Sequence, residues 1–249
     1  MKKGELKLKN VGKKFKGFWA VKGVTAKFLP QRITGLIGPN GAGKTTLFHL
    51  ITGELVPDEG DIIYQGESLK ENPPWRVARK GIGRMFQDVR VFQGLSVLEN
   101  IVLALQTPEE EIPFYGLLKK KEKKEEALRW IEFVGLENEI KRKAEDLSYG
   151  QQKLLALARI MAGNFDLLLL DEPIAGVSPV ITKKILKLLR EMVDKYKKTL
   201  VIIEHNMNVI MDITDWVYFL NEGRIYFSGR PDHVLGAEEV RRLYLGLVK

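Results

Sequence analysis

The pattern of apolar and polar residues divides the chain into segments of two kinds. Between residues 5 and 28, single apolar side chains are separated by polar ones, which predicts short antiparallel strands with one buried face. Further along, short apolar runs alternate with segments whose apolar residues recur at helical spacing. The runs predict strands at 33–37, 82–86, 167–171 and 199–204, and the periodic segments predict helices near 44–52, 97–105, 120–134, 151–163 and 179–196. This alternation predicts an α/β fold with a mostly parallel sheet covered by helices.

Residues 107–146 interrupt this alternation. They contain an acidic run at 109–111 and a helix rich in lysine and glutamate, but no apolar run that predicts a strand. We therefore expect one domain of 249 residues in which 1–87 and 161–249 form the α/β core. Residues 88–160 are expected to form a helical subdomain inserted into that core.

The composition predicts a soluble protein with a well-buried core, because hydrophobic residues make up 45% of the chain. The longest apolar runs, such as 167–170, span only a few residues, and the N-terminus lacks the apolar stretch of a signal peptide. From these features we expect a protein that stays in the cytosol. Because the chain has no cysteine, it has no disulfide, no thiolate metal site and no cysteine nucleophile.

The chain carries a formal net charge of +8, from 40 lysine and arginine residues against 32 acidic ones. Much of the excess lies in the run 119–124, which opens a predicted helix with apolar positions at Ala127, Leu128 and Ile131. The simplest interpretation is a solvated helix face. Attraction to anionic lipid headgroups and binding of RNA or DNA remain as alternatives.

A glycine-rich segment separates the strand at 33–37 from the next helix, and it reads Gly38-Pro39-Asn40-Gly41-Ala42-Gly43-Lys44-Thr45-Thr46. The glycines allow successive backbone N–H groups to turn inward around a polyphosphate, and the helix directs its positive N-terminus at the same anion. Lys44 is placed to reach the β- and γ-phosphates, and Thr45 to bind Mg²⁺. Strand, loop and helix together predict a phosphate-binding loop for ATP.

The apolar strand at 167–171 ends in Asp171 and is followed directly by Glu172. Open α/β sheets bind their ligands at the carboxyl ends of the strands. Asp171 is therefore expected to hold Mg²⁺, and Glu172 to polarise an attacking water molecule as a general base. A buried strand that ends in a carboxylate is common by itself, but downstream of a phosphate-binding loop it predicts ATP hydrolysis.

These motifs resemble those of the ATP-binding-cassette (ABC) ATPases, and the resemblance covers nearly the whole chain. It implies a P-loop NTPase core of the ABC type. The segment Leu147-Ser148-Tyr149-Gly150-Gln151 stands where that family has its signature, normally with glycine at the position of Tyr149. In the family, the signature acts on ATP held by a second subunit. The resemblance therefore implies that Ser148, Gly150 and Gln151 bind nucleotide in a head-to-tail dimer with an identical or paralogous cassette.

Two more residues match catalytic positions of the family. Gln87, after the strand at 82–86, matches the glutamine that reaches Mg²⁺ and the attacking water. His205, after the strand at 199–204, matches the histidine that contacts the γ-phosphate. The resemblance thus implies that Gln87 and His205 join Lys44 as catalytic residues beside the general base.

Aromatic residues near the N-terminus provide candidates for binding the adenine base. Phe15 fits the family's aromatic residue that stacks on adenine, and Phe18 and Trp19 are competing candidates. Burial of Phe15 in the core is a further alternative. Ser178 stands where the family usually has an aspartate in its dimer-facing loop, so we do not expect the usual charged contact there.

Several short runs resemble, more narrowly, the ATPase subunits of branched-chain amino-acid importers; among them are Phe86-Gln87-Asp88-Val89-Arg90-Val91-Phe92, Ile203-Glu204-His205-Asn206-Met207 and Tyr244-Leu245-Gly246. Lipopolysaccharide-export ATPases share several of these runs and are the alternative. The resemblance implies an ATP-hydrolysing importer subunit, peripheral to the cytoplasmic side of the cell membrane. Its implied partners are an integral membrane permease and, indirectly, an extracytoplasmic substrate-binding protein.

The permease is expected to contact apolar residues that follow Gln87, unless these pack inside the subdomain; they are Val89, Val91, Phe92 and Leu95. Two other functions compete with transport. ABC proteins that act on ribosomes or DNA usually contain two cassettes or a long coiled coil. This chain has neither feature, so we expect no nucleic-acid partner. A nucleotide-gated scaffold without turnover is disfavoured because Glu172 and His205 are both present.

Overall fold

The computed structural model describes residues 3–106 and 120–245. The strands are β1 (Leu6–Phe15), β2 (Phe18–Phe28), β3 (Ile33–Ile37), β4 (Glu59–Tyr64), β5 (Glu67–Ser68), β6 (Ile82–Met85), β7 (Leu167–Asp171), β8 (Thr199–Ile203), β9 (Trp216–Asn221) and β10 (Arg224–Gly229). The helices are α1 (Lys44–Ile51), α2 (Pro74–Arg79), α3 (Val97–Ala104), α5 (Lys120–Val134), α6 (Tyr149–Ala162), α7 (Pro179–Asp194), α8 (Met207–Ile213), α9 (Pro231–Gly236) and α10 (Glu238–Leu245), with single 3-10 turns η2 (Glu137–Glu139) and η3 (Ala144–Asp146). Within the described residues, no helix combines the length and the apolar character needed to cross a membrane.

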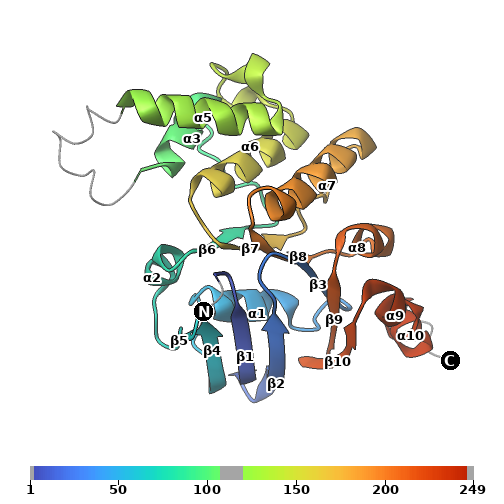
Figure 1. The fold of residues 1–249 in the computed structure, drawn as a ribbon. Coiled ribbons are helices and arrows are strands. Elements are labelled where there is room, and N and C mark those ends of the chain that lie inside the picture. The colour runs from blue at the N-terminus through green and yellow to red at the C-terminus, as the bar shows by residue number, and fades with distance from the viewer. Residues whose placement is uncertain (1–2, 107–119, 246–249) are drawn as a thin grey trace. The chain divides into compact units, whose positions relative to one another are not determined.

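The described residues form two compact units (Figure 1). The first unit is built from the described parts of 1–84, 166–172 and 190–249. The second unit is built from the described parts of 85–165 and from 173–189. The chain therefore crosses from one unit to the other four times.

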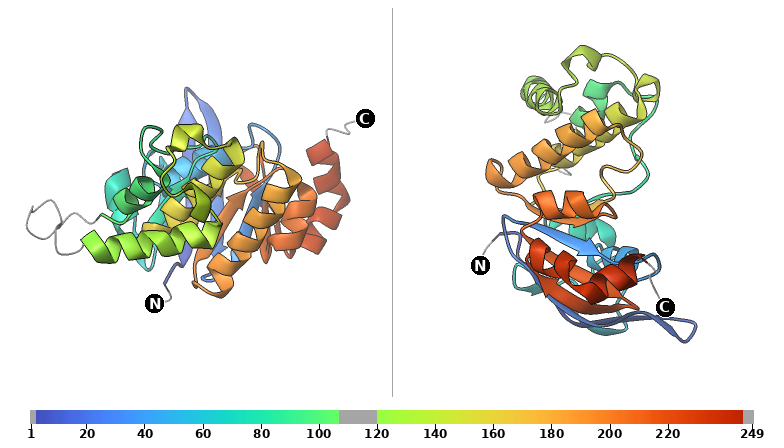
Figure 2. Two further views of the ribbon diagram at one scale, coloured as in Figure 1. Left: turned by 90° about the horizontal axis from the view of Figure 1, so that it is seen from above. Right: turned by 90° about the vertical axis from the view of Figure 1, so that its right-hand side faces the viewer.

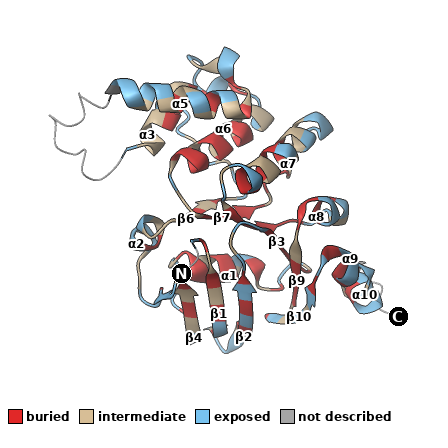
Figure 3. Ribbon diagram, viewed as in Figure 1, coloured by how far each residue is buried: buried red, intermediate tan, exposed pale blue. Residues whose placement is uncertain are grey.

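The first unit is based on two sheets (Figure 1). The four-stranded sheet has the order β2-β1-β4-β5 and is antiparallel. The six-stranded sheet has the order β10-β9-β3-β8-β7-β6; strands β9, β3, β8 and β7 are parallel, and β10 is antiparallel to β9. All residues of β3, β7 and β8 are buried, whereas buried and exposed residues are mixed along β1 and β2 (Figure 3). This is the burial expected for central parallel strands and for a sheet with one solvated face.

Helix α1 packs into one apolar core with strands of both sheets. It contributes Leu47, Phe48, Leu50 and Ile51, which cluster with buried residues of β1, β2 and β4 and with those of β3, β7, β8 and β9. Burial of each large apolar side chain contributes about 1.5–3 kcal/mol to stability. This packing fixes the direction of α1 and therefore the direction in which its N-terminus points.

A second core covers the other face of β3 and β9. Neighbouring residues of a strand point to opposite faces, so Leu36 belongs to the first core and Ile37 to the second. Val217 and Phe219 of β9 join Ile37, together with buried residues of α8, α9 and α10. Helix α9 contacts α8, α10, β9 and β10, and the right-hand view of Figure 2 shows α9 and α10 in front of these strands.

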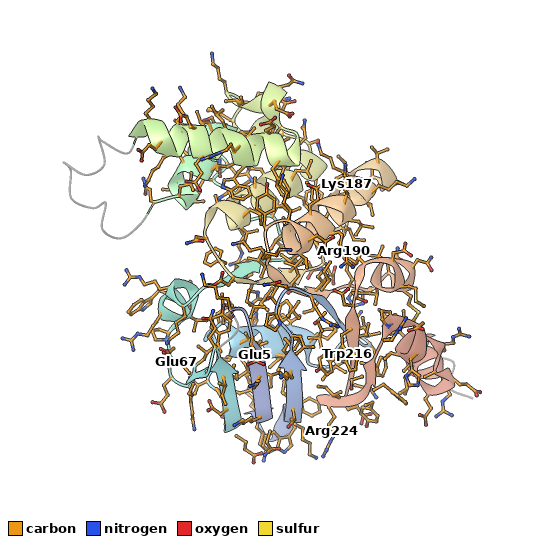
Figure 4. The ribbon with its side chains drawn as sticks, viewed as in Figure 1. Glu5, Glu67, Lys187, Arg190, Trp216 and Arg224 are labelled. Carbon is orange, nitrogen blue, oxygen red and sulfur yellow. The ribbon has the colours of Figure 1, made fainter. Side chains whose placement is uncertain are left out.

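A polar junction holds the start of β3. Arg190, which Figure 4 labels near the end of α7, donates hydrogen bonds to the Ile213 carbonyl (2.6 Å) and to Asp215 Oδ1 (3.3 Å). The other carboxylate oxygen of Asp215 accepts a hydrogen bond from the Ile33 N–H at 2.7 Å. One arginine thus ties the end of α7 to the strand that leads into the glycine-rich loop.

The second unit is helical. Helices α3, α5 and α6 pack against one another, and α3 begins with a capping box in which the Ser96 hydroxyl and the Glu99 carboxylate each accept from the other's backbone N–H. The buried side chain of Asn100 accepts from the Phe92 N–H and donates to the Phe92 and Leu95 carbonyls. Asn100 therefore holds the loop before α3 in one conformation.

The α/β fold expected from the sequence is confirmed. Strands β3 and β7 and helix α5 begin and end where the apolar pattern placed them, at 33–37, 167–171 and 120–134. Helix α6 begins two residues earlier than predicted because Ser148, not a later residue, caps it. Part of the segment 107–146, namely 107–119, lies outside the described residues.

Candidate nucleotide-binding and catalytic site

The glycine-rich loop joins β3 to α1, as the sequence predicts. Gly38, Gly41 and Gly43 have φ values of +149°, +79° and +101°, which disfavour residues with a side chain. A Cβ atom on Gly38 would lie 1.9 Å from the Leu220 carbonyl oxygen, and one on Gly43 would lie 2.2 Å from the Ala20 carbonyl oxygen. Two of the three glycines are therefore required by close backbone contacts as well as by conformation.

Lys44 begins α1 and directs its charge into this loop. Its Nζ donates hydrogen bonds to the carbonyl oxygens of Gly38 (2.7 Å) and Pro39 (2.9 Å). Burial lowers the pKa of the Lys44 ammonium group, while the negative charges of Glu172 and Asp171 oppose that shift. A buried cation enclosed by a backbone loop is suited to hold an anion such as a polyphosphate.

The N-terminus of α1 is also available to an anion. Its N-cap residue is Gly43, so no side chain caps the helix, and its first turn contains no acidic residue. The first N–H groups of a helix have no partner within the helix and carry partial positive charge. The exposed Thr45 and the half-buried Thr46 lie in this first turn. Their position fits the predicted roles at the phosphates and at Mg²⁺.

Asp171 is the last residue of β7, at the carboxyl end of the parallel strands, and is buried. Its Oδ2 lies 3.4 Å from Nη2 of Arg84, whose Nη1 donates to Glu54 Oε1 at 2.9 Å. Burial raises the pKa of the Asp171 carboxyl group, and the Arg84 guanidinium counteracts the rise. Asp171 is thus held in place by an arginine that the motif analysis did not identify.

Arg84 and Glu54 show what the sequence analysis missed. Arg84 is a charged residue within a short apolar run. Because buried charges are paired, this position was the one available signal that Arg84 has an acidic partner. Glu54 lies in a turn after α1, accepts from the Thr52 hydroxyl at 3.0 Å, and has His49 Nε2 3.7 Å away. Nothing in the sequence spacing connects Glu54 to Asp171.

Glu172 and His205 are brought together by two adjacent parallel strands. Asp171 pairs with Ile203 in the register of β7 and β8, so the residues that follow these strands meet. His205 Nε2 lies 3.0 Å from Glu172 Oε1. Glu172 has a φ of +48°, in the left-handed region that is uncommon for residues other than glycine, and its N–H donates to the Ile203 carbonyl at 2.9 Å. This backbone conformation directs the Glu172 carboxylate to the histidine.

The aromatic candidates lie at the tip of the β1–β2 hairpin. Phe15 and Phe18 are register partners and are exposed, by 43% and 67%, so neither is a core residue; Trp19 is half-buried. The strand that starts with Phe18 passes the glycine-rich loop, since the Ala20 carbonyl lies beside Gly43. The hairpin therefore presents exposed rings in the same unit as the phosphate loop, and Phe15, Phe18 and Trp19 all stay candidates for adenine.

The remaining predicted residues belong to the second unit. Gln87 follows β6 and is exposed. Ser148 is the N-cap of α6, and its hydroxyl accepts from the Gln151 N–H at 3.3 Å. Gln151 completes the capping box by accepting from the Ser148 N–H, and it donates to Glu139 Oε1 at 3.0 Å. Gly150 lies against Ile181, which a Cβ would approach to 3.2 Å.

Across the described residues, no three or more His, Asp or Glu side chains gather into a metal-binding cluster. This finding is compatible with Mg²⁺, which nucleotide sites hold through one or two protein oxygens together with phosphates and water. The buried carboxylate of Asp171 and the hydroxyl of Thr45 are oxygen donors of the kind that Mg²⁺ prefers.

An inward-facing lysine, a helix start without a side-chain cap and a carboxylate at the strand ends are together suited to bind a nucleotide polyphosphate. This combination places the first unit among the P-loop nucleoside triphosphatases. The sequence profile of the ABC transporter family matches residues 21–175, more than half of the chain. The chain therefore belongs to the ABC transporter family, whose ATP-binding cassettes are ATPases that power transport. This confirms the resemblance, the fold type and the ATPase activity expected from the sequence.

Curated relatives match the chain over nearly its full length. It is 38% identical over 240 residues to the high-affinity branched-chain amino acid transport ATP-binding protein LivG of Escherichia coli K12, covering 94% of each chain. It is 35% identical over 248 residues to the corresponding protein BraF of Pseudomonas aeruginosa, covering 97% of each. It is also 32% identical over 241 residues to the lipopolysaccharide export system ATP-binding protein LptB of Haemophilus influenzae, covering 97% of each.

Solved structures show the same fold. A crystal structure of the ADP conformation of MJ1267, an ATP-binding cassette of an ABC transporter, has a TM-score of 0.85 and 34% identity, covering 97% of this chain and 98% of that one. A dimeric structure of the cassette MJ0796 in a post-hydrolysis state, bound to ADP and phosphate, has a TM-score of 0.77 and 26% identity, covering 91% and 98%. Nucleotide binding and dimer formation thus occur in cassettes similar to this chain.

Proposed function

We propose that this chain is the ATP-hydrolysing subunit of an ABC importer for branched-chain amino acids. The full-length similarity to LivG and BraF supports the substrate class, because both are described as branched-chain amino acid transport proteins. The pairing of Glu172 with His205 at the strand ends supports turnover rather than nucleotide binding alone. In this role the chain binds as a peripheral protein to the cytoplasmic side of the membrane.

The residues of the first unit have separate roles in hydrolysis. Lys44 and the loop amides hold the β- and γ-phosphates and neutralise their charge. Thr45 and Asp171 would hold Mg²⁺, and the bound ion would supply positive charge to polarise the phosphoryl group. Glu172 accepts the proton of the attacking water as general base. His205, which lies 3.0 Å from the Glu172 carboxylate, orients that carboxylate and contacts the γ-phosphate.

The residues of the second unit act on nucleotide and on partners. The N-terminus of α6, with Ser148, Gly150 and Gln151, is assigned to the ATP of a second cassette, and Gln87 to the Mg²⁺ and the attacking water. The dimeric structure of the similar cassette MJ0796 supports the formation of a dimer. Tyr149, which departs from the family glycine, is exposed and lies against Gly176.

The loop before α3 is the proposed contact for the permease. Phe92 is exposed there, while Val89, Val91 and Leu95 are only partly exposed. Asn100 holds the Phe92 backbone through both its N–H and its carbonyl, and the Arg159 guanidinium lies 4.7 Å from the Phe92 ring. An exposed aromatic residue on an ordered loop is a typical anchor for a protein partner.

The hydrolytic role is tested with Glu172→Gln. Loss of the general base should lower steady-state phosphate release by about 10²–10⁴-fold. ATP binding should remain, because Lys44 and the loop are unchanged, and an ATP-held dimer should accumulate. Near-normal hydrolysis by this variant would show that another group is the base.

The transport role is tested in proteoliposomes that contain the permease, the substrate-binding protein and this chain. We expect ATP-dependent uptake of leucine, isoleucine or valine, with loss of uptake in Phe92→Glu and normal uptake in the exposed control Met211→Glu. Soluble ATPase activity should stay largely intact in both variants. Lipopolysaccharide extraction without amino-acid uptake would favour the LptB-like alternative, and ATPase stimulation by RNA or DNA would contradict transport.

A further inference from the structure

The ring of His205 is held on both sides within the first unit. One ring nitrogen, Nε2, lies 3.0 Å from Glu172 Oε1. The other, Nδ1, lies 3.4 Å from the hydroxyl oxygen of Tyr244 on α10. The same hydroxyl donates a hydrogen bond to the backbone carbonyl of His205 at 3.1 Å. Tyr244, 39 residues further along the chain, therefore contacts both the side chain and the backbone of this histidine.

Packing of helix α10 holds Tyr244 in place. Tyr244 and Leu243 pack against the apolar core that contains Val234 of α9 and Val240 of α10. Arg241 Nε donates to the Leu235 carbonyl at 3.1 Å and so ties the two helices together. The ring of Tyr244 is thus fixed by packing, so its hydroxyl stays in a position from which it can hydrogen-bond to His205.

The hydroxyl keeps its proton under working conditions. Burial raises the pKa of Tyr244 to about 12, and the negative charges of Glu204 and Glu172 add to the rise. A phenol has one proton to donate and lone pairs with which to accept. The hydroxyl can therefore bond to both the His205 carbonyl and Nδ1 of the ring.

We propose that Tyr244 is a positioning residue for His205: it retains the ring with Nδ1 bound to the phenol oxygen and Nε2 directed at Glu172 and the reacting phosphate. The inference rests on the proposed function of His205. Tyr244 touches neither Glu172 nor the phosphate loop in the contacts described above, so it acts through His205. Its loss should lower the rate of hydrolysis without weakening nucleotide binding, because the groups that bind the phosphates are unchanged.

The test variant is Tyr244→Phe, which removes the hydroxyl and keeps the packed ring. Tyr226→Phe is the matched control, since Tyr226 of β10 is exposed. We expect Tyr244→Phe to lower kcat for ATP by about 3- to 10-fold, the range that corresponds to one hydrogen bond, with KM within about 2-fold of normal. Tyr226→Phe should match the unmodified chain in both constants. In a His205→Ala background, Tyr244→Phe should have no further effect.

Nuclear magnetic resonance provides a readout that does not depend on hydrolysis. The chain contains only three histidines, so ¹⁵N-histidine labelling gives few signals. The signals that are missing in His205→Ala are those of His205. The Nδ1 signal of His205 should change in Tyr244→Phe but not in Tyr226→Phe. If the chain shows no ATPase activity, the proposed function fails, yet this arm still decides whether the contact orients the ring.

Two results would overturn the inference. One is an unchanged His205 spectrum in Tyr244→Phe. The other is a loss of kcat and a rise of KM that appear together with a large drop in melting temperature, because that combination indicates a structural role for Tyr244 alone.

Discussion

The buried pair of Arg84 and Asp171 allows a quantitative test of how the Asp171 carboxylate is supported. The two side chains are each only 6% exposed, and Nη2 of Arg84 lies 3.4 Å from Oδ2 of Asp171. Removing one partner of a buried ion pair leaves the other charge uncompensated, which costs about 3–5 kcal/mol. The Asp171 charge also acts on Lys44, so some compensation remains and we expect the lower part of this range.

We therefore predict that Arg84→Met lowers the free energy of unfolding by about 3 kcal/mol. In a protein of this size, 1 kcal/mol corresponds to a change of about 2–4 °C in melting temperature, so the expected decrease is about 6–12 °C. The measurement is thermal unfolding without nucleotide, followed by circular dichroism. Glu54→Gln is the control, because Glu54 is 34% exposed and its contact with Arg84 should contribute only about 1 kcal/mol.

A double-mutant cycle isolates the pair. In an Asp171→Asn background the uncompensated charge is absent, so Arg84→Met should cost at least about 1.5 kcal/mol less than in the unmodified chain. Equal costs in the two backgrounds would refute the reasoning, since they would show that Arg84 stabilises the fold by packing rather than by its charge.

Three further predictions concern single residues. Lys44→Ala should weaken binding of Mg²⁺-ATP by about 10- to 100-fold in calorimetry, because the loop loses its cation; unchanged affinity would contradict the phosphate-loop assignment. Phe15→Ala should weaken nucleotide binding by about 1–3 kcal/mol if Phe15 stacks on adenine, and an effect seen only in Phe18→Ala would transfer that role to Phe18. Glu172→Gly should be more stable to heat than Glu172→Ala by about 1 kcal/mol, because both lose the contact with His205 but only glycine accepts a φ of +48° without strain. Equal melting temperatures would show that this conformation is not costly.

The sequence predicted best those features that depend on neighbours in the chain. Strand β7 and helix α5 were located to the residue because a run of leucines and a helical apolar spacing are strong local signals. The loop from Gly38 to Gly43 was predicted with its function, since its glycines serve a conformation that a motif encodes locally. Glu172 and His205 were each placed after a predicted strand, but their contact was not predicted, because it depends on the pairing of β7 with β8.

Features that depend on distant residues were not accessible in the same way. No prediction covered β4, β9, β10 or the helices α8 to α10, although β9 contains an apolar run, Trp216 to Leu220, as long as β3. Tyr244 was noticed only as part of a resembling run, and its contact with His205 depends on how α10 packs against α9. Register and packing decide such contacts, and neither can be read from local spacing.

The site itself explains why these unpredicted residues matter. Glu172 adopts an unfavourable backbone conformation, Lys44 is a buried cation, and Asp171 is a buried carboxylate whose pKa is raised by burial. Each of these conditions costs stability, and each is offset by a specific neighbour, because a buried charge or a strained residue persists only when its surroundings hold it. The Ile203 carbonyl holds the backbone of Glu172, and Arg84 compensates the carboxylate of Asp171. Under the proposed function, the motifs supply the groups that act on ATP, and residues outside the motifs, such as Arg84 and Tyr244, hold those groups in place.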